Sequence, residues 1–386
     1  MSFAVIQPGG TLGVMGGGQL GRMFVHAAQR MGYFTAVLDP DPQSPAGRVS
    51  HHHIQTGYSD NRGLDRLAAC SDAVTTEFEN VPAPALAALA LRRPVAPGAD
   101  AVAIAQDRAR EKAHFRSCGV ACAPYASIGS DQDLPDIPST LLPGILKTAR
   151  LGYDGKGQRR VGTPKQLATA WEEFGRVPCI LEKLLPLAAE WSVIVARGAD
   201  GHVVHLPPQR NLHRNGILAV TEVFEGNIPQ EQASRAIAAA RAIAKGLEYV
   251  GVLCVEFFVL DDGSLVVNEM APRPHNSGHW SMDGCDVSQF DLQVRTLAGL
   301  PLPPPRQHSA AVMLNLLGDL WFVHGAERPP VWQDVLALPG AHLHLYGKTG
   351  ARAGRKMGHL TVTAASGQEA RRTALAAAAL LGIEPF

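Results

Sequence analysis

The sequence predicts an α/β protein of two or three domains, beginning with an N-terminal doubly wound α/β domain. The chain has 386 residues, 46% of them hydrophobic, which is enough to bury a large core. Short apolar runs also alternate with helix-like runs from the start of the chain. A strand at Thr11–Met15 precedes a glycine turn, a helix over residues 19–31 and a second strand over residues 34–39.

Composition argues against several classes of partner. Lys and Arg total 35 and Asp and Glu total 35, so no global field attracts nucleic acid or an anionic membrane, and we expect neither partner. The sequence lacks a signal-peptide layout and any apolar run long enough to span a bilayer. Its six cysteines show no CxxC spacing, which favours a reducing, cytoplasmic location.

The first glycine turn, residues 16–21, fits the pattern G-x-G-x-x-G, and Asp39 follows about twenty residues later. Such a turn brings backbone amides close to an anion. A nicotinamide dinucleotide, a ribose phosphate or simple tight packing would each account for it. The next strand, Ala73–Thr76, runs into Glu77, which is interpreted either as a ligand contact or as a helix N-terminal acid.

The middle of the chain carries residues suited to a nucleotide. A strand over residues 143–147 ends in Lys147, and the loop over residues 152–158 reads GYDGKGQ. Three glycines and two cations suit a loop that closes over phosphates, although a flexible hairpin tip is the alternative and the Walker A spacing is absent. A further strand over residues 180–185 runs into a proline, with Glu190 beyond it. Its backbone could hold an adenine ring while Glu190 accepts ribose hydroxyls.

The segment over residues 252–270 predicts a β-hairpin with two opposed acids. Apolar runs flank Asp262-Gly263, a dipeptide that favours a two-residue type I′ turn. That turn would place Glu256 directly opposite Glu269, where like charges repel. A hard cation such as Mg²⁺ would relieve the repulsion, whereas a solvent-facing acid pair on an edge hairpin is the alternative.

A stiff segment follows the second acid and carries Arg273, His275 and Asn276. Mg²⁺ beside an arginine is typical of phosphoryl transfer. Farther on, the sequence predicts a proline-rich linker at residues 301–305, a strand over 342–346, a basic loop over 348–356, a strand over 359–363 and a helix over 368–381.

Six motifs in order resemble the ATP-grasp superfamily, and within it the 5-(carboxyamino)imidazole ribonucleotide synthases of purine biosynthesis. They are G-x-G-Q-L-G-R at residues 16–22, T-x-E at 75–77, G-Y-D-G-K-G-Q at 152–158, N-x-H-x-N-G-I-L at 211–218, P-R-x-H-N-S-G-H-W at 272–280 and G-R-K-M-G-H at 354–359. The resemblance implies an ATP-grasp fold with a small C-terminal domain. It also implies a ligase that converts ATP and bicarbonate to carboxyphosphate and carboxylates 5-aminoimidazole ribonucleotide.

The resemblance assigns ATP and Mg²⁺ as cofactors and names the residues that hold them. The expected ATP contacts are Arg108, Lys147, Gly152, Tyr153, Asp154, Gly155, Lys156, Gly157, Gln158, Glu182, Lys183, Leu184, Leu185, Glu190, His213, Asn268 and Glu269. The metal ligands are expected to be Glu256, Glu269 and Asn268. Strict strand alternation turns Asn268 away from Glu269, so this assignment requires a bulge or the end of the strand.

Bicarbonate and carboxyphosphate are assigned by the same resemblance to Arg273, with His275 and Asn276 as positioning groups. The ribonucleotide is assigned to Gln19, Leu20, Glu77, Tyr153, Asp154, Lys348, Arg355 and Lys356. The loop between Lys348 and the G-R-K motif is one residue longer than the family pattern. The phosphate contact therefore falls on either Arg352 or Arg355, and a solvated basic turn is the alternative for the loop.

The resulting organisation is an N-terminal domain at residues 1–105, an ATP-grasp domain at 106–300 with a lid near 125–185, and a C-terminal domain at 301–386. The resemblance also implies a homodimer.

Two rival functions remain, a formate-dependent glycinamide ribonucleotide transformylase and a nicotinamide-dependent oxidoreductase. The transformylase typically has Glu where this chain has Gln19, and the oxidoreductase leaves the acid hairpin unexplained.

Overall fold

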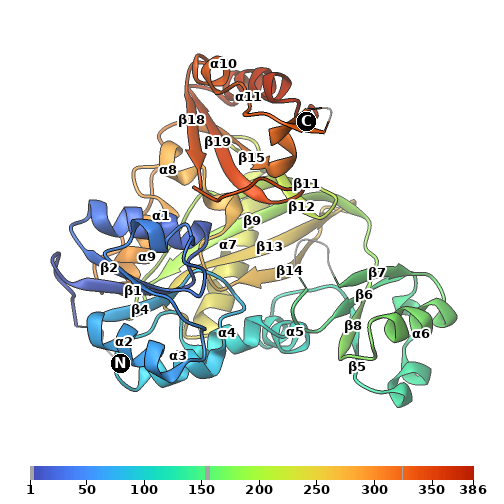
Figure 1. Ribbon diagram of the computed structural model, residues 1–386. Helices are drawn as coiled ribbons and strands as arrows, with labels where there is room; N and C mark the ends of the chain where they lie inside the picture. The colour runs from blue at the N-terminus through green and yellow to red at the C-terminus, as the bar shows by residue number, and fades with distance from the viewer. Residues whose placement is uncertain (1–3, 153–156, 324) are drawn as a thin grey trace.

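The structure is a computed structural model that describes residues 4–152, 157–323 and 325–386. The expected loop residues Tyr153, Asp154, Gly155 and Lys156 lie outside the described residues. Figure 1 shows an N-terminal lobe, a smaller lobe over residues 125–183, and a large sheet between them that continues into the C-terminal region. In the described part of the chain, no helix combines the length and apolar character needed to cross a membrane.

The N-terminal lobe is built on a parallel sheet with strand order β3-β2-β1-β4. Its strands are β1 (Thr11–Met15), β2 (Phe34–Leu38), β3 (His52–Ile54) and β4 (Ala73–Thr76), and its helices are α1 (Gln19–Arg30), α2 (Asn61–Cys70), α3 (Ala83–Ala90) and α4 (Ala99–Ala105), with a 3₁₀ turn η1 (Gly47–Val49). Val14 packs on one face with Phe24, whereas Met15 packs on the other with Leu64. Both faces are therefore buried, which confirms the doubly wound prediction.

The smaller lobe is an antiparallel sheet with strand order β5-β8-β6-β7. Its elements are β5 (Tyr125–Ile128), η2 (Asp131–Asp136), η3 (Ser139–Leu141), β6 (Gly144–Thr148), β7 (Gln158–Val161), α6 (Pro164–Glu173) and β8 (Cys179–Lys183). Leu146, Leu181 and Trp171 form its separate core. Helix α5 (Arg108–Ser117) links this lobe to the N-terminal lobe and runs beneath the central sheet in Figure 1.

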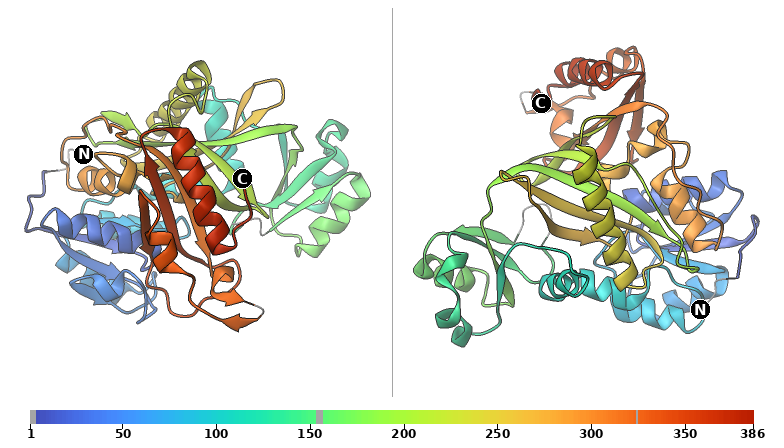
Figure 2. Two further views of the ribbon diagram at one scale, coloured as in Figure 1. Left: turned by 90° about the horizontal axis from the view of Figure 1, so that it is seen from above. Right: turned by 180° about the vertical axis from the view of Figure 1, so that it is seen from behind.

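The central sheet has the order β14-β13-β9-β11-β12-β15-β19-β18, with β10 paired to β9. The strands are β9 (Leu187–Arg197), β10 (Val203–His205), β11 (Gln209–Arg214), β12 (Ile217–Val223), β13 (Gly251–Leu260), β14 (Leu265–Ala271), β15 (Ala310–Leu317), β18 (Ala341–Leu345) and β19 (Lys356–Ala364). Sequence reasoning did not identify β9, β11, β12 or β15. Helix α7 (Gln230–Gly246) covers one face, as the right panel of Figure 2 shows.

The C-terminal region continues the central sheet, because β12 pairs with β15 in antiparallel register. The other elements from residue 276 onward are η4 (Asn276–Gly278), α8 (Ser281–Gly284), α9 (Gln289–Leu297), η5 (Gly318–Trp321), β16 (Phe322–Val323), β17 (Ala326–Glu327), α10 (Trp332–Leu336) and α11 (Gly367–Leu381). Helix α11 packs on β15 and β19 through Ala374 and Ala378, whose small side chains allow close approach. The left panel of Figure 2 shows α11 lying across these strands.

The β13–β14 hairpin corrects the predicted turn. The Leu260 amide donates to the Ser264 carbonyl at 2.9 Å, so the loop has three residues rather than the expected Asp262-Gly263 pair. A type I′ turn requires positive φ at both central residues, but only Gly263 has it, at 77°. The Asp262 carboxylate instead accepts the Ser264 amide at 2.8 Å.

Candidate active site

Glu256 and Glu269 are direct partners in the β13–β14 ladder, as the sequence predicts. The three-residue loop alone would have paired Glu256 with Asn268, since Phe257 already pairs with Val267. A register shift beside Glu256 leaves Asn268 as an extra residue, which restores the pairing of the two acids. The bulge that the metal assignment requires is therefore present, and it offsets the unexpected turn.

Helix α5 holds this bulge through three side chains that approach β14. Arg108 donates to Glu269 at 2.9 Å, Glu111 accepts the Met270 amide at 2.7 Å, and Lys112 donates to the Asn268 carbonyl at 3.1 Å. Lys112 is fully buried, and Arg108 is only 17% exposed. Nothing in the sequence alone distinguished Arg108 from a surface residue. In the helix, however, Arg108 lies four residues before Lys112, so both side chains lie on the same helix face, which packs against β14.

The pKa values of the two opposed acids move apart. Burial, followed by the charge of Glu269, raises the pKa of Glu256 to about 7. Burial would also raise the pKa of Glu269, but the Arg108 guanidinium and Lys147 hold it below its usual range. Burial and Glu269 together raise the pKa of Glu111 to about 8. Three carboxylates so close together, of which Glu111 is buried and Glu256 nearly so, favour binding of a cation.

The donor set fits Mg²⁺. Glu256 and Glu269 offer carboxylate oxygens, and the buried Asn268 Oδ1 has no hydrogen-bond partner among the described residues. A buried oxygen without a donor needs a ligand or water to offset its lost hydration. Because all three groups are oxygen donors, they suit a hard cation.

Lys147 lies at the end of β6 and forms an ion pair with Glu182 on β8, at 3.1 Å. Lys112 lies 3.3 Å from the other oxygen of the same carboxylate. Burial lowers the pKa of Lys147, and the Glu182 charge opposes this change. With Arg108, these two lysines gather three cations at the meeting of α5, β6 and β8, which is an environment suited to polyphosphate.

The strand end expected to hold adenine offers fewer amides than the sequence suggested. The Lys183 amide donates to the Pro124 carbonyl at 2.9 Å, and the Leu184 amide donates to the Pro143 carbonyl at 3.0 Å. Among the described residues, the Leu185 amide has no backbone acceptor. Leu185 therefore supplies the amide that remains for a ligand. Gln158 begins the return strand β7, where it pairs with Lys147. Gly157 lies in the turn just before this strand, and Gly152 precedes the undescribed residues.

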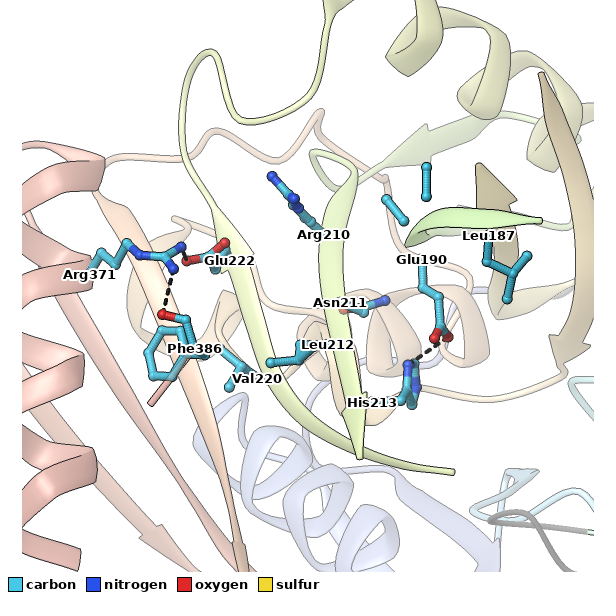
Figure 3. A pocket seen from close by; sticks show the side chains of 12 residues that line it. Leu187, Glu190, Arg210, Asn211, Leu212, His213, Val220, Glu222, Arg371 and Phe386 are labelled. Atoms are coloured by element: carbon cyan, nitrogen blue, oxygen red, sulfur yellow. Dashed lines mark hydrogen bonds and ion pairs between the residues drawn. The ribbon is translucent and has the colours of Figure 1, made fainter. Parts of the chain in front are cut away.

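Glu190 and His213 face each other across β9 and β11, with 2.7 Å between Glu190 Oε2 and His213 Nδ1. Figure 3 shows both at one end of a cavity of about 280 Å³ that extends past Leu212 to Arg371 and Phe386. His213 is 19% exposed, so it lies within the cavity wall rather than on the open surface. Burial lowers the pKa of His213, but its hydrogen bond to Glu190 produces a net rise.

The segment after β14 carries Arg273, His275 and Asn276, and it places His275 beside Glu256. His275 Nε2 lies 3.5 Å from Glu256 Oε1, and its Nδ1 lies 2.9 Å from Ser277 Oγ. Burial, with the charge of Arg273, holds the pKa of His275 well below its usual range. Both side-chain polar atoms of Asn276 are buried without a partner among the described residues, so this amide is available to a ligand.

The residues expected to bind ribonucleotide meet across a long sequence separation. Lys348 donates to Gln19 at 2.7 Å and to the Lys356 carbonyl at 2.6 Å. Arg355 donates to the carbonyls of Thr349 and Gly350, which folds its guanidinium into the basic loop, whereas Arg352 is exposed. These contacts bring the first glycine turn and the basic loop together.

Glu77 accepts the amides of Gly18 and Gly21 at 2.8 and 3.0 Å, at the N-terminus of α1. Asp39 accepts the Gly17 amide at 2.7 Å. Leu20 is buried in the core, so only its backbone remains available to a substrate. Internal carboxylates thus occupy amides that a dinucleotide pyrophosphate would need, which argues against the oxidoreductase.

Sequence reasoning missed Glu111 and Lys112 as site residues, and it assigned no specific role to Glu79. Glu79 pairs with Arg273, while Glu111 and Lys112 support the bulge. The available signal was a charged helix with acid and base at adjacent positions, which sequence alone does not distinguish from a solvated face.

Three family models match consecutive parts of the chain. They are the ribonucleotide synthetase preATP-grasp domain at residues 10–106, the ATP-grasp domain at 113–290 and the phosphoribosylaminoimidazole carboxylase C-terminal domain at 311–373. Among curated relatives, the N5-carboxyaminoimidazole ribonucleotide synthase of Brucella melitensis is 44% identical, covering 94% of this chain and 98% of the relative. That of Bacillus subtilis is 40% identical, covering 94% and 93%.

Solved structures agree with these matches. An ADP complex of N5-carboxyaminoimidazole ribonucleotide synthetase has a TM-score of 0.90 at 39% identity and covers 98% of each chain. The Aspergillus clavatus enzyme, in complex with ADP and 5-aminoimidazole ribonucleotide, has a TM-score of 0.89 at 30% identity, covering 98% of this chain and 100% of that one. These likenesses confirm the ATP-grasp fold and the predicted enzyme class, an ATP-dependent ligase. The chain therefore belongs to the N5-carboxyaminoimidazole ribonucleotide synthase family of the ATP-grasp superfamily.

Proposed function

We propose that this protein uses ATP to carboxylate the 5-amino group of 5-aminoimidazole ribonucleotide with bicarbonate, in purine biosynthesis. The observation that carries the proposal is the set of oxygen donors on Glu256, Asn268 and Glu269, which lies between a cluster of cations and the Arg273 segment. Family membership, through close relatives of this activity, supports the choice of substrates.

The reaction has two steps. A bicarbonate oxygen attacks the γ-phosphorus of ATP, the bond from that phosphorus to the bridging oxygen breaks, and ADP leaves with formation of carboxyphosphate. The 5-amino nitrogen then attacks the carboxyl carbon. The bond from that carbon to the phosphate oxygen breaks, phosphate leaves, and the amine gives up one proton. Holding the acceptor next to carboxyphosphate favours carboxyl transfer over release to water.

Side chains at the ATP end would neutralise and orient the polyphosphate. Lys147 and Arg108 would contact phosphate oxygens, since Arg108 pairs with Glu269 and the charge of Lys147 helps to lower the pKa of the same acid. Glu190 would accept the ribose hydroxyls, and the Leu185 amide would donate to adenine. When bound by Glu256, Asn268 and Glu269, Mg²⁺ supplies positive charge to the phosphate oxygens during transfer.

Side chains at the other end would hold the two acceptors. Arg273 would balance the charge of bicarbonate, and Asn276 would hydrogen-bond to it through its unpartnered amide. Lys348, with Arg355 and Lys356, would bind the ribonucleotide phosphate. Gln19 and Glu77 would line the pocket beside Lys348. The loop at residues 152–158 is proposed to close over both ligands.

The test is ADP release by the purified protein with substrates omitted one at a time. We expect release to require, or be strongly stimulated by, 5-aminoimidazole ribonucleotide together with bicarbonate, and the carboxylated ribonucleotide to form. Formate with glycinamide ribonucleotide should not replace them. Formylation of glycinamide ribonucleotide without carboxylation of aminoimidazole ribonucleotide would reject the proposal in favour of the transformylase.

We also propose a reducing, cytoplasmic setting and a homodimer. All six cysteines are free, which supports the first. The homodimer is supported by the family resemblance alone. Light scattering during size-exclusion chromatography should give twice the chain mass, and a monomer mass at working concentration would contradict it.

A further inference from the structure

Glu79 links the N-terminal lobe to the residue expected to bind bicarbonate. Its carboxylate accepts a hydrogen bond from Arg273 Nε, across 194 positions of sequence. The side chains are 30% and 17% exposed, so water only partly screens the ion pair. Burial lowers the pKa of Arg273, but the Glu79 carboxylate more than offsets this, so the guanidinium stays charged.

Two contacts determine how the Arg273 guanidinium is oriented. Glu79 occupies Nε, and Nη1 donates to the Pro274 carbonyl at 3.1 Å. Among the described residues, no acceptor is found for Nη2. The hydrogen atoms on Nη2 therefore remain for an anion, while the rest of the planar group is held still.

The backbone at Glu79 is fixed in place by hydrogen bonds from the Gln106 side chain. Gln106 Nε2 donates to the carbonyls of Glu79 and Val81 at 2.7 and 2.6 Å. Glu79 lies two residues after Glu77, whose carboxylate binds the N-terminus of α1. One short segment thus connects the first glycine turn to Arg273.

We propose that Glu79 is a positioning residue that orients Arg273 to bind bicarbonate and carboxyphosphate. The alternative is a competitor, in which Glu79 blocks Arg273 until bicarbonate displaces it. The contact at Nε leaves both hydrogen atoms of Nη2 without an acceptor among the described residues. An anion can therefore bind Arg273 while Glu79 stays in place, which favours positioning. This inference rests on the proposed function.

The test compares Glu79→Ala and Glu79→Gln with the wild type in steady-state ADP release. Loss of a hydrogen bond between charged groups predicts a roughly 10- to 100-fold rise in the KM for bicarbonate with Glu79→Ala. The KM for ATP should stay within about twofold. Glu79→Gln retains an acceptor oxygen and should recover part of the loss, which a role in folding alone would not explain.

Arg30→Gln is the matched control. It breaks the ion pair between Arg30 and Asp291, which also joins α1 of the N-terminal lobe to α9. This variant should leave the KM for bicarbonate unchanged. An equal rise in the KM for bicarbonate in Glu79→Ala and Arg30→Gln would show that loss of any ion pair between the N-terminal lobe and the rest of the chain raises this KM. That result would overturn the proposal.

A double-mutant cycle identifies the route of the effect. If Glu79 acts through Arg273, Glu79→Ala should cause no further loss of residual turnover in an Arg273→Ala background. An additive loss would overturn the inference, as would an unchanged or lower KM for bicarbonate in Glu79→Ala alone. Failure of wild-type ADP release to depend on bicarbonate would instead reject the proposed function, so the two failures are distinguishable.

Discussion

Glu256 and Glu269 stand opposite each other on β13 and β14 because Asn268 is accommodated as a bulge. The pairing sets two carboxylates side by side, and the bulge removes the strict strand alternation that would turn Asn268 away from Glu269. Helix α5 stabilises the bulge by bonding to backbone groups of Asn268 and Met270. The expected cation site therefore depends on a helix as much as on the hairpin.

Removing either acid should abolish most of the activity but change stability in opposite directions. Both Glu256→Gln and Glu269→Gln should lower ADP release by orders of magnitude, because each removes an anionic metal ligand. Without Mg²⁺ at pH 8, Glu256→Gln should raise the unfolding temperature. The raised pKa of Glu256 means that its ionisation costs stability at this pH. Glu269→Gln should lower the unfolding temperature under the same conditions, since Arg108 loses its charged partner.

Calorimetry in chelator, together with turnover at saturating Mg²⁺, measures both effects. Near-native turnover in either variant would contradict the metal assignment. A shift of the same sign in both unfolding temperatures would contradict the stability argument.

Asn268→Ala should separate metal binding from folding. Its Oδ1 accepts no hydrogen bond among the described residues, so its loss should change the unfolding temperature little. The Mg²⁺ concentration for half-maximal ADP release should rise about tenfold or more. A titration of Mg²⁺ at fixed ATP measures this requirement. An unchanged requirement would remove Asn268 from the ligand set.

Lys112→Met should destabilise the protein although it keeps an unbranched side chain of similar size. Lys112 is fully buried between Glu182 and the Asn268 carbonyl, so its removal leaves a buried carboxylate with one fewer cation. We expect a loss of about 3–5 kcal/mol in the free energy of unfolding. Urea denaturation measures it, with exposed Lys165→Met as the control. Equal stability of the two variants would show that Lys147 alone satisfies Glu182.

Ribonucleotide binding should weaken above pH 8. Burial, followed by the charges of Arg355 and others nearby, lowers the pKa of Lys348 to about 8. The free enzyme therefore loses this positive charge as the pH rises through 8, and kcat/KM for the ribonucleotide should fall by up to about tenfold per pH unit. The pH profile of kcat/KM for the ribonucleotide measures the effect. The KM for ATP should stay constant over the same pH range and serves as the control.

Lys348→Arg provides the comparison, because an arginine keeps its charge throughout this range. Its profile should stay level above pH 8, even if its absolute rate is lower. An identical decline in both proteins would assign the titration to another group. The same shift predicts that stability rises with pH between about 8 and 10.5, where the unfolded chain binds more protons at this lysine.

The alternation of strands and helices in the N-terminal lobe was readable from local sequence, whereas four strands of the central sheet were not. Apolar runs predicted β1, β2 and β4 correctly. The loop that glycine and charge spacing predicts after Lys147 includes residues 153–156, which lie outside the described part of the chain. These signals are local because strand periodicity and turn chemistry depend on neighbouring residues. The pairing of Glu256 with Glu269 was also correct, although the turn that was used to argue for it was wrong.

The tertiary structure decided which charges meet. Lys112 reaches the Asn268 carbonyl across 156 positions, and Lys348 reaches Gln19 across 329. Sequence spacing carries no information about such contacts, since they depend on how separate lobes pack. The sequence by itself determined the fold class and the family, and it predicts which residues bind ATP, a metal and an anion. Packing alone decided that Lys112 is buried and that Glu79 pairs with Arg273, because burial and pairing arise only when distant segments exclude water together.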